Sequence, residues 1–84
     1  MKYTTYILYS ESLKKYYVGS TVDLADRLRR HNNGEGKFTK KGMPWELIWS
    51  NVFASRSEAV SLEMKIKKRG IKRFLEDQNT GFGK

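Results

Sequence analysis

Apolar and polar positions follow one another in short blocks along this chain, and the blocks differ in period. Residues 3–9 (YTTYILY) and 16–20 (YYVGS) are rich in β-branched and aromatic side chains, which is typical of strands. The polar segment SESLKK between them is short, which predicts an antiparallel hairpin. A loop rich in glycine and lysine then leads to WELIWSNVF at 45–53, which we expect to form a third strand.

Two further blocks have the period of amphipathic helices. Thr21 or Asp23 can cap the first helix, which we expect to end near His31, before the turn-forming run Asn-Asn-Gly. Ser55 begins the second helix, with Glu58 three residues later in the spacing of a capping box.

The remaining segments complete the predicted architecture. The second helix is expected to end at Gly70, and IKRFLED predicts a short final helix over 71–77 before a frayed tail at 78–84. The element order β-β-α-β-α-α favours an α+β fold, in which helices flank a small three-stranded antiparallel sheet. The sequence contains no repeat or linker, so we expect residues 1–84 to form a single domain.

Two polar side chains border the apolar stripe of the first predicted helix. At about 100° per residue, Arg27 and His31 lie beside Leu24 and Leu28 rather than on the opposite face. For Arg27 the alternative is a pair with Asp23, one turn earlier, which would contribute only about a few tenths of a kcal/mol. A lone histidine is likewise often only a packed side chain.

Glu63 lies within the apolar arc of the second predicted helix. The arc consists of Ala59, Val60, Leu62, Met64 and Ile66. Burying a carboxylate without a partner is costly, so Glu63 needs a cation, a metal ion or hydrogen-bond donors. A pair with Lys67, four residues later, is the structural alternative. We favour a functional role, because such a pair adds little stability and does not explain the placement.

Two tyrosines lie in the predicted hairpin beside a glycine. Tyr6 and Leu8 share one face of the first strand, and Tyr17 and Gly19 share one face of the second. Gly19 leaves room for a bulge or for close approach of a ligand to the backbone. Strand tyrosines usually pack while the hydroxyl stays in contact with water, and that remains the alternative for Tyr6 and Tyr17.

The amino-acid composition indicates which class of partner the protein is suited to bind. The chain has 17 Lys and Arg against 9 Asp and Glu, a formal net charge of +8 and a pI near 9.9. A small basic domain is suited to a polyanion such as nucleic acid, because phosphate binding releases counterions; the alternative is charge that serves only solubility. There is no cysteine, and no apolar run approaches the roughly 20 residues that cross a bilayer. We expect a soluble, cytoplasmic protein without a membrane partner.

Taken together and in order, these residues resemble the GIY-YIG nuclease superfamily. The matching positions are Thr4-Thr5-Tyr6, Tyr17-Val18-Gly19, Arg27, His31 and Glu63. The resemblance extends from Tyr3 to about Leu75. It is greatest to small stand-alone members related to the N-terminal incision domain of the bacterial excision-repair endonuclease.

The resemblance implies hydrolysis of DNA phosphodiester bonds with one divalent cation, Mg²⁺ or Mn²⁺. It makes Glu63 the metal ligand, since a carboxylate is a hard oxygen donor. Arg27 corresponds to the arginine that steadies the scissile phosphate. Tyr6 corresponds to the tyrosine that activates or orients the attacking water, Tyr17 to its partner, and His31 to a position that assists proton transfer.

Two positions depart from the family pattern. Many members carry lysine just after the second signature, where this chain has Ser20, and the late asparagine of several members has no assigned counterpart, since Asn79 lies in the predicted tail. A tyrosine with an ordinary pKa near 10 is also a poor base at neutral pH unless a neighbour lowers that pKa.

Basic residues outside this set are expected to contact DNA phosphates without reading sequence. They are Lys37, Lys40, Lys41, Lys67, Lys68 and Arg69. We therefore expect weak sequence preference and selectivity for nicked or branched DNA.

Two other functions stay open. One is a non-catalytic module that binds nucleic acid and retains the nuclease fold. The other is a structural domain that binds a protein partner through Trp45, Trp49 and Phe53. Trp45, Leu47 and Trp49 alternate on one face of the predicted strand, a pattern more typical of core than of an interface.

Overall fold

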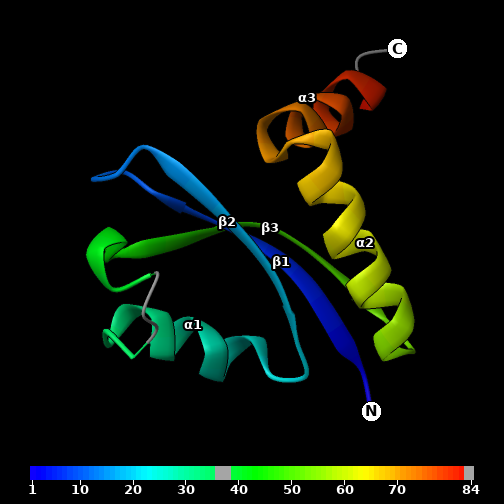
Figure 1. Cartoon of the computed structure of the whole chain (residues 1–84). Helices are drawn as coiled ribbons and strands as arrows, with labels where there is room; N and C mark the ends of the chain where they lie inside the picture. The colour runs from blue at the N-terminus through cyan, green and yellow to red at the C-terminus, as the bar shows by residue number, and fades with distance from the viewer. Residues whose placement is uncertain (36–38, 83–84) are drawn as a thin grey trace.

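The structure, a computed structural model, describes residues 1–35 and 39–82. Its elements in chain order are β1 (Tyr3–Ser10), β2 (Lys15–Thr21), α1 (Leu24–Asn32), the 3₁₀ helix η1 (Lys40–Gly42), β3 (Trp45–Phe53), α2 (Arg56–Arg69) and α3 (Ile71–Phe82) (Figure 1). Both strand pairings are antiparallel. The structure confirms the predicted α+β fold and its element order, and adds the short η1 within the predicted loop.

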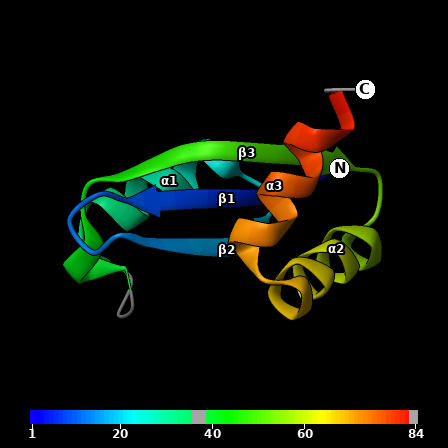
Figure 2. The same cartoon turned by 90° about the horizontal axis from the view of Figure 1, so that it is seen from above.

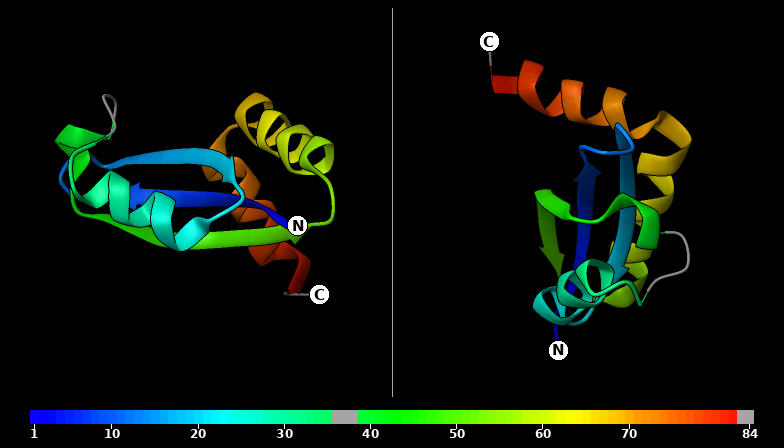
Figure 3. Two further views of the ribbon diagram at one scale, coloured as in Figure 1. Left: turned by 90° about the horizontal axis from the view of Figure 1, so that it is seen from below. Right: turned by 90° about the vertical axis from the view of Figure 1, so that its left-hand side faces the viewer.

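The sheet has the order β2-β1-β3, so β1 is central and β2 is an edge strand. Figure 2 shows α3 in front of the sheet and α1 behind it, and the left panel of Figure 3 shows the same arrangement from the opposite side. In both views α2 lies beside the free edge of β2. This edge is therefore accessible to side chains from both sides of the sheet.

The helix boundaries follow local capping chemistry. Asp23 caps α1, because its carboxylate accepts a hydrogen bond from the Asp26 backbone amide. Ser55 caps α2, because its hydroxyl accepts a hydrogen bond from the Glu58 amide, as the predicted capping box requires, and donates one to the Glu58 carboxylate. After α2, Gly70 adopts φ 99°, a left-handed conformation that favours glycine.

The last helix is longer than the sequence predicts. It continues to Phe82, past the expected end at Asp77. Asn79 and Gly81 are poor helix formers, but neither lacks a backbone donor as proline does, so the helical hydrogen bonds can continue through them. In the described ranges of the chain, no helix is long and apolar enough to cross a bilayer.

Two clusters of buried side chains lie on opposite faces of the sheet. Against α1, Tyr6, Leu8 and Trp45 are buried with Tyr17, Leu24 and Leu28 packed on them. Against α2 and α3, Ile7, Val18 and Ile66 are buried, with Trp49, Leu62, Ile71, Phe74 and Leu75 packed on them. The alternation of Tyr6, Ile7 and Leu8 along β1 thus supplies both clusters.

The predicted stripe of Trp45, Leu47 and Trp49 on one strand face is wrong. In the pairing of β3 with β1, Leu8 is opposite Leu47 but Ile7 is opposite Trp49, so Ile48 is an extra residue in β3. Such a bulge shifts the alternation by one residue. Trp45 consequently packs on the α1 side, and Trp49 packs against Phe74 of α3 with ring centroids 5.0 Å apart.

Candidate active site

Tyr6 reaches from the central strand across Gly19 of the edge strand. The two residues are partners in the β1–β2 register. A Cβ atom at Gly19 would lie 2.7 Å from the Tyr6 hydroxyl oxygen and 3.3 Å from the Tyr17 ring. Glycine is therefore required here because the phenol occupies the space of a side chain. The close approach predicted at Gly19 exists, but Tyr6 makes it rather than a ligand.

His31 is buried, with 6% of its surface exposed, and holds the Tyr6 hydroxyl. Its Nε2 is 3.2 Å from the Tyr6 oxygen, and its Nδ1 is 2.8 Å from Oγ1 of buried Thr39. The Tyr17 ring lies edge-on at 5.1 Å between centroids. The structure therefore brings Tyr6, Tyr17 and His31 together, as the sequence predicts. The contribution of Thr39 was missed, because it lies in a polar loop with no periodic pattern.

Trp45 anchors the loop that carries Thr39. Its indole N–H donates to the Thr39 carbonyl at 2.6 Å. Its backbone amide donates to the side-chain oxygen of Asn32, whose amide group donates back to the Trp45 carbonyl. A Cβ atom at Gly42 would overlap the Trp45 ring. These contacts tie the end of α1 to the start of β3 and so fix His31 in place.

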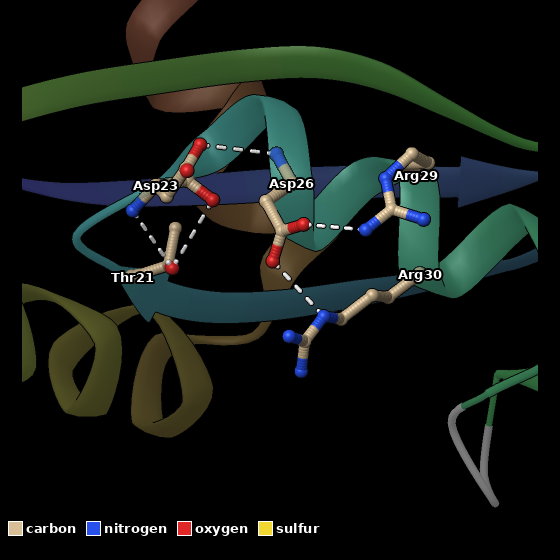
Figure 4. A network of polar contacts seen from close by, with 5 residues as sticks. All are labelled: Thr21, Asp23, Asp26, Arg29 and Arg30. Carbon is tan, nitrogen blue, oxygen red and sulfur yellow. Dashed lines mark hydrogen bonds and ion pairs between the residues drawn. The ribbon is translucent and has the colours of Figure 1, made fainter.

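Arg27 is exposed and lines an open cavity of about 400 Å³ with Tyr17, Arg30, His31 and Glu35. Figure 4 shows the neighbouring charges of α1: Asp26 pairs with both Arg29 and Arg30, at 2.6 and 2.9 Å. Asp23 is occupied as the helix cap. Among the described residues no ion pair joins Arg27 to Asp23, so the structural alternative for Arg27 is not adopted.

Glu63 reaches the β2 edge from the other side of the sheet. Its Oε1 accepts a hydrogen bond from the Ser20 hydroxyl at 2.9 Å, and its Oε2 is 2.9 Å from the Lys67 ammonium. Its side chain is 18% exposed. The ion pair considered as the alternative is thus present, together with a second partner. Ser20 follows Gly19 in β2, so the carboxylate is held next to the position over which the Tyr6 phenol lies.

The apolar arc predicted around Glu63 is narrower than expected. Leu62 and Ile66 pack on the sheet and Ala59 is fully buried, but Val60 is 36% and Met64 64% exposed. Because α2 lies beside the sheet edge, only one stripe of the helix meets the core. Glu63 borders that stripe at the rim of the core.

Burial determines the protonation states of the Tyr6 phenol and the His31 imidazole. The pKa of Tyr6 rises to about 12, first through burial and then through Tyr17, while Arg27 opposes the rise; the charge of Glu63 adds to it. Burial lowers the pKa of His31, and the charge of Arg27 lowers it further. At neutral pH the cluster therefore holds a neutral phenol and a neutral imidazole. The contribution of Glu63 also indicates that its carboxylate lies within electrostatic range of the phenol.

At the β2 edge, the carboxylate of Glu63 is the candidate ligand for a metal ion. In the described part of the chain, no three His, Cys, Asp or Glu side chains group together as ligands. One half-buried carboxylate, oriented by Ser20, fits an ion such as Mg²⁺, which commonly uses one or two carboxylates and completes its shell with water and substrate phosphate. The Lys67 ammonium group pairs with one oxygen of that carboxylate, so a metal ion that binds this oxygen would have to displace the ammonium group.

The basic residues predicted to contact DNA fall into different settings. Lys40 and Lys41 lie in η1, and Lys67 and Lys68 lie near Glu63 on α2. Figure 2 shows η1 and α2 projecting past opposite ends of the β2 edge. Arg69 is engaged by Asp77 of α3 through two hydrogen bonds of 2.9 and 3.0 Å. Lys37 lies outside the described residues.

Comparisons with known proteins agree with this geometry. The sequence profile of the GIY-YIG catalytic domain matches residues 2–74. A UPF0213 protein of Streptococcus pneumoniae serotype 4 is 44% identical over 67 residues, which span 76% of this chain and 68% of that protein. A UPF0213 protein of Streptococcus pyogenes serotype M5 is 44% identical over 57 residues, or 67% of this chain and 62% of that protein. The solution NMR structure of a UPF0213 protein from Bacillus halodurans superposes with a TM-score of 0.59 at 30% identity, covering 99% of this chain and 87% of the other.

Proposed function

The chain belongs to the GIY-YIG family of nucleases, and from this premise we propose that it hydrolyses DNA phosphodiester bonds with Mg²⁺ or Mn²⁺ held at Glu63. The observation that carries the proposal is the convergence of two sets of side chains at the β2 edge. The phenol of Tyr6 and the imidazole of His31 arrive from the α1 side, and the carboxylate of Glu63 arrives from α2, bound to Ser20 of the edge strand.

Arg27 provides the phosphate contact. Its guanidinium has no carboxylate partner among the ion pairs of the described residues, and it lines the cavity in front of Tyr17 and His31. A guanidinium matches the geometry of a phosphate and stabilises the negative charge that develops on it during hydrolysis.

Water activation follows from the protonation of Tyr6 and His31. A phenol with a pKa of about 12 is almost wholly protonated at pH 7, so free phenolate is too scarce to act as the base. Neutral His31 lies 3.2 Å from the phenol oxygen and has a basic nitrogen to offer. Tyr6 can then accept the proton of the attacking water while passing its own proton to Nε2 of His31. In that tautomer Nδ1 carries the other hydrogen and donates it to Thr39.

Glu63 would hold the divalent cation, whose chemistry is Lewis-acid stabilisation of charge on the phosphate oxygens. Ser20 fixes one oxygen of the carboxylate toward the β2 edge. Lys67 neutralises the other oxygen in the present arrangement, so a divalent cation that uses both oxygens would have to displace its ammonium group.

Nicked or branched DNA in repair or recombination is the substrate context we propose. The lysines of η1 and of α2 lie on different elements near the β2 edge and would contact phosphates without reading sequence, which is compatible with recognition of DNA structure.

Glu63→Gln tests the proposal, with Glu46→Gln on the exposed face of β3 as the matched control. Cleavage of a supercoiled plasmid and of a branched duplex is measured with Mg²⁺ and with Mn²⁺. We expect Glu63→Gln to lower the cleavage rate at least about 100-fold, the loss of roughly 2.7 kcal/mol of transition-state stabilisation. Glu46→Gln should cleave like the parent. Equal cleavage by both variants would disprove the role of Glu63.

The ion pair between Glu63 and Lys67 favours a second candidate, a non-catalytic DNA-binding module. Lys67 already supplies the positive charge that a half-buried carboxylate requires. Salt-dependent DNA binding by the parent protein without metal-stimulated cleavage of any tested substrate would select this function.

A further inference from the structure

A second arginine shares a cavity with Arg27. The cavity has a volume of about 180 Å³ and lies where the end of β2 meets α1 and the first turn of α2. It is lined by Ser20 and Thr21 of β2, by Arg27 and by Arg56, with Tyr3, Val22 and Ala59 completing it. Ser20 is also the residue that binds Glu63, so the cavity adjoins the candidate active site.

The described residues that line this cavity include two basic side chains, Arg27 and Arg56. None of the described residues that line it is Asp or Glu, and none of the ion pairs of the described residues includes Arg27 or Arg56. An anion bound in this cavity would be attracted by the positive charge of both arginines. A phosphate group has the matching charge and accepts hydrogen bonds from both guanidinium groups.

The position of Arg56 in its helix is unfavourable without such a ligand. Arg56 is the first residue of α2, where the helix dipole favours negative side chains. Acidic Glu58 in the same turn accepts a hydrogen bond from Ser55, and no ion pair among the described residues joins it to Arg56. The location is also rigid, because the buried hydroxyl of Thr5 donates to the Ala59 carbonyl at 2.8 Å and ties this turn of α2 to β1.

The geometry points to Arg56 as a second phosphate-binding residue, which together with Arg27 holds one phosphate group of a nucleic-acid strand. The inference rests on the proposed function for the identity of the ligand, but not on cleavage or on a metal ion. Helix α2 then has two roles, because it positions Glu63 and also supplies Arg56 as a phosphate ligand. Because Arg27 and Arg56 approach from different helices, the phosphate would be held from two directions.

Binding measured without metal separates this inference from the nuclease proposal. A duplex of about 20 base pairs is titrated in EDTA at several salt concentrations, with Arg56→Gln, Arg56→Lys and the control Arg29→Gln. Arg29 is an exposed arginine whose charge is already paired with Asp26. We expect Arg56→Gln to weaken binding about 5- to 10-fold and to reduce the salt slope by about 1, while Arg29→Gln changes affinity less than about 2-fold.

Arg56→Lys should restore the salt slope but only part of the affinity, because lysine keeps the charge and loses the planar fork. Circular dichroism of each variant checks that the fold is retained. Titration with inorganic phosphate, followed by NMR of the arginine Nε–H groups, should shift Arg27 and Arg56 together in the parent and should shift Arg27 less in Arg56→Gln.

Affinity and salt slope of Arg56→Gln equal to those of Arg29→Gln would overturn the inference, as would a phosphate titration that leaves the Arg56 signal unmoved. A protein that shows the Arg56 effects but cleaves no DNA would refute the nuclease proposal alone. A protein that cleaves DNA with Arg56→Gln unaffected in binding would refute this inference alone.

Discussion

The two faces of the sheet are built from different chemistry. On the α2 and α3 side, Ile7, Val18 and Ile66 form a buried aliphatic cluster. On the α1 side, Leu8 and Trp45 are buried together with a phenol, an imidazole and the hydroxyl of Thr39, and these polar groups are joined by hydrogen bonds of 3.2 and 2.8 Å. Aliphatic packing stabilises a fold without demanding partners, whereas each buried polar group must be satisfied.

In this chain of 84 residues, substitutions that affect stability and substitutions that affect the candidate chemistry should therefore fall mainly on different faces of the sheet. Every buried side-chain polar atom among the described residues has a hydrogen-bond partner. Both faces contribute apolar packing, and the α1 face in addition orients the polar groups of the candidate site. Changes on the two faces should consequently affect different measurements, and the three predictions below run from the largest expected effect to the smallest.

Ile66→Ala should destabilise the fold most. Ile66 is fully buried between α2 and the sheet, so truncation leaves a cavity and should lower the free energy of unfolding by about 3 kcal/mol. Val60→Ala, on the exposed side of the same helix, should change it by less than about 0.5 kcal/mol. Urea unfolding measures both. A loss of DNA binding by Ile66→Ala protein under conditions where it is still folded would contradict the proposed separation of the faces.

Gly19→Ala should displace the Tyr6 phenol. The new methyl group would overlap the hydroxyl oxygen, which should lower the free energy of unfolding by about 2 kcal/mol and abolish most cleavage. Tyr6→Phe removes that oxygen and its bond to His31, at a cost of about 1 kcal/mol.

When both substitutions are combined, Tyr6→Phe leaves only ring carbons near the new methyl group, so Gly19→Ala should cost less than it does beside Tyr6. A double-mutant cycle on the free energy of unfolding measures this coupling. Strictly additive effects would show that Gly19 and Tyr6 do not interact as the structure indicates.

The pH dependence of stability should reveal His31. Burial and Arg27 lower the pKa of His31, so in acid the unfolded chain takes up a proton on this imidazole before the native state does. Its contribution to stability is therefore complete above pH about 6.5 and is lost as the pH falls through the lowered native pKa. Urea unfolding between pH 7.5 and 5 should show a steeper decline for the parent than for His31→Gln. Parallel declines would mean that His31 is not buried in its neutral form.

Local patterns predicted the elements because local forces produce them. Ser55 and Glu58 are close in sequence, so the capping box and the start of α2 could be predicted. The same holds for the alternation that places Tyr6 and Ile7 on different faces. The order of Tyr6, Tyr17, Arg27, His31 and Glu63 was also sufficient to indicate the family that the profile match confirms.

Three features of the site depended on contacts between distant residues. The Ser20 to Glu63 bond joins positions 43 apart, the His31 to Thr39 bond crosses a loop without periodicity, and the cavity shared by Arg27 and Arg56 requires α1 and α2 to meet at one strand end. The bulge at Ile48 likewise arises from how β3 pairs with β1. No spacing along the chain encodes such pairings.

The sequence by itself determined the strands, the helices, their caps and the residue types available for chemistry, because hydrophobic period and capping act over a few residues. The tertiary structure decided that β2 is an edge strand with α2 beside it. It therefore also decided which side chains come together at the free edge of β2. That arrangement depends on how the whole chain buries two clusters at once, and it places Glu63 within electrostatic range of Tyr6.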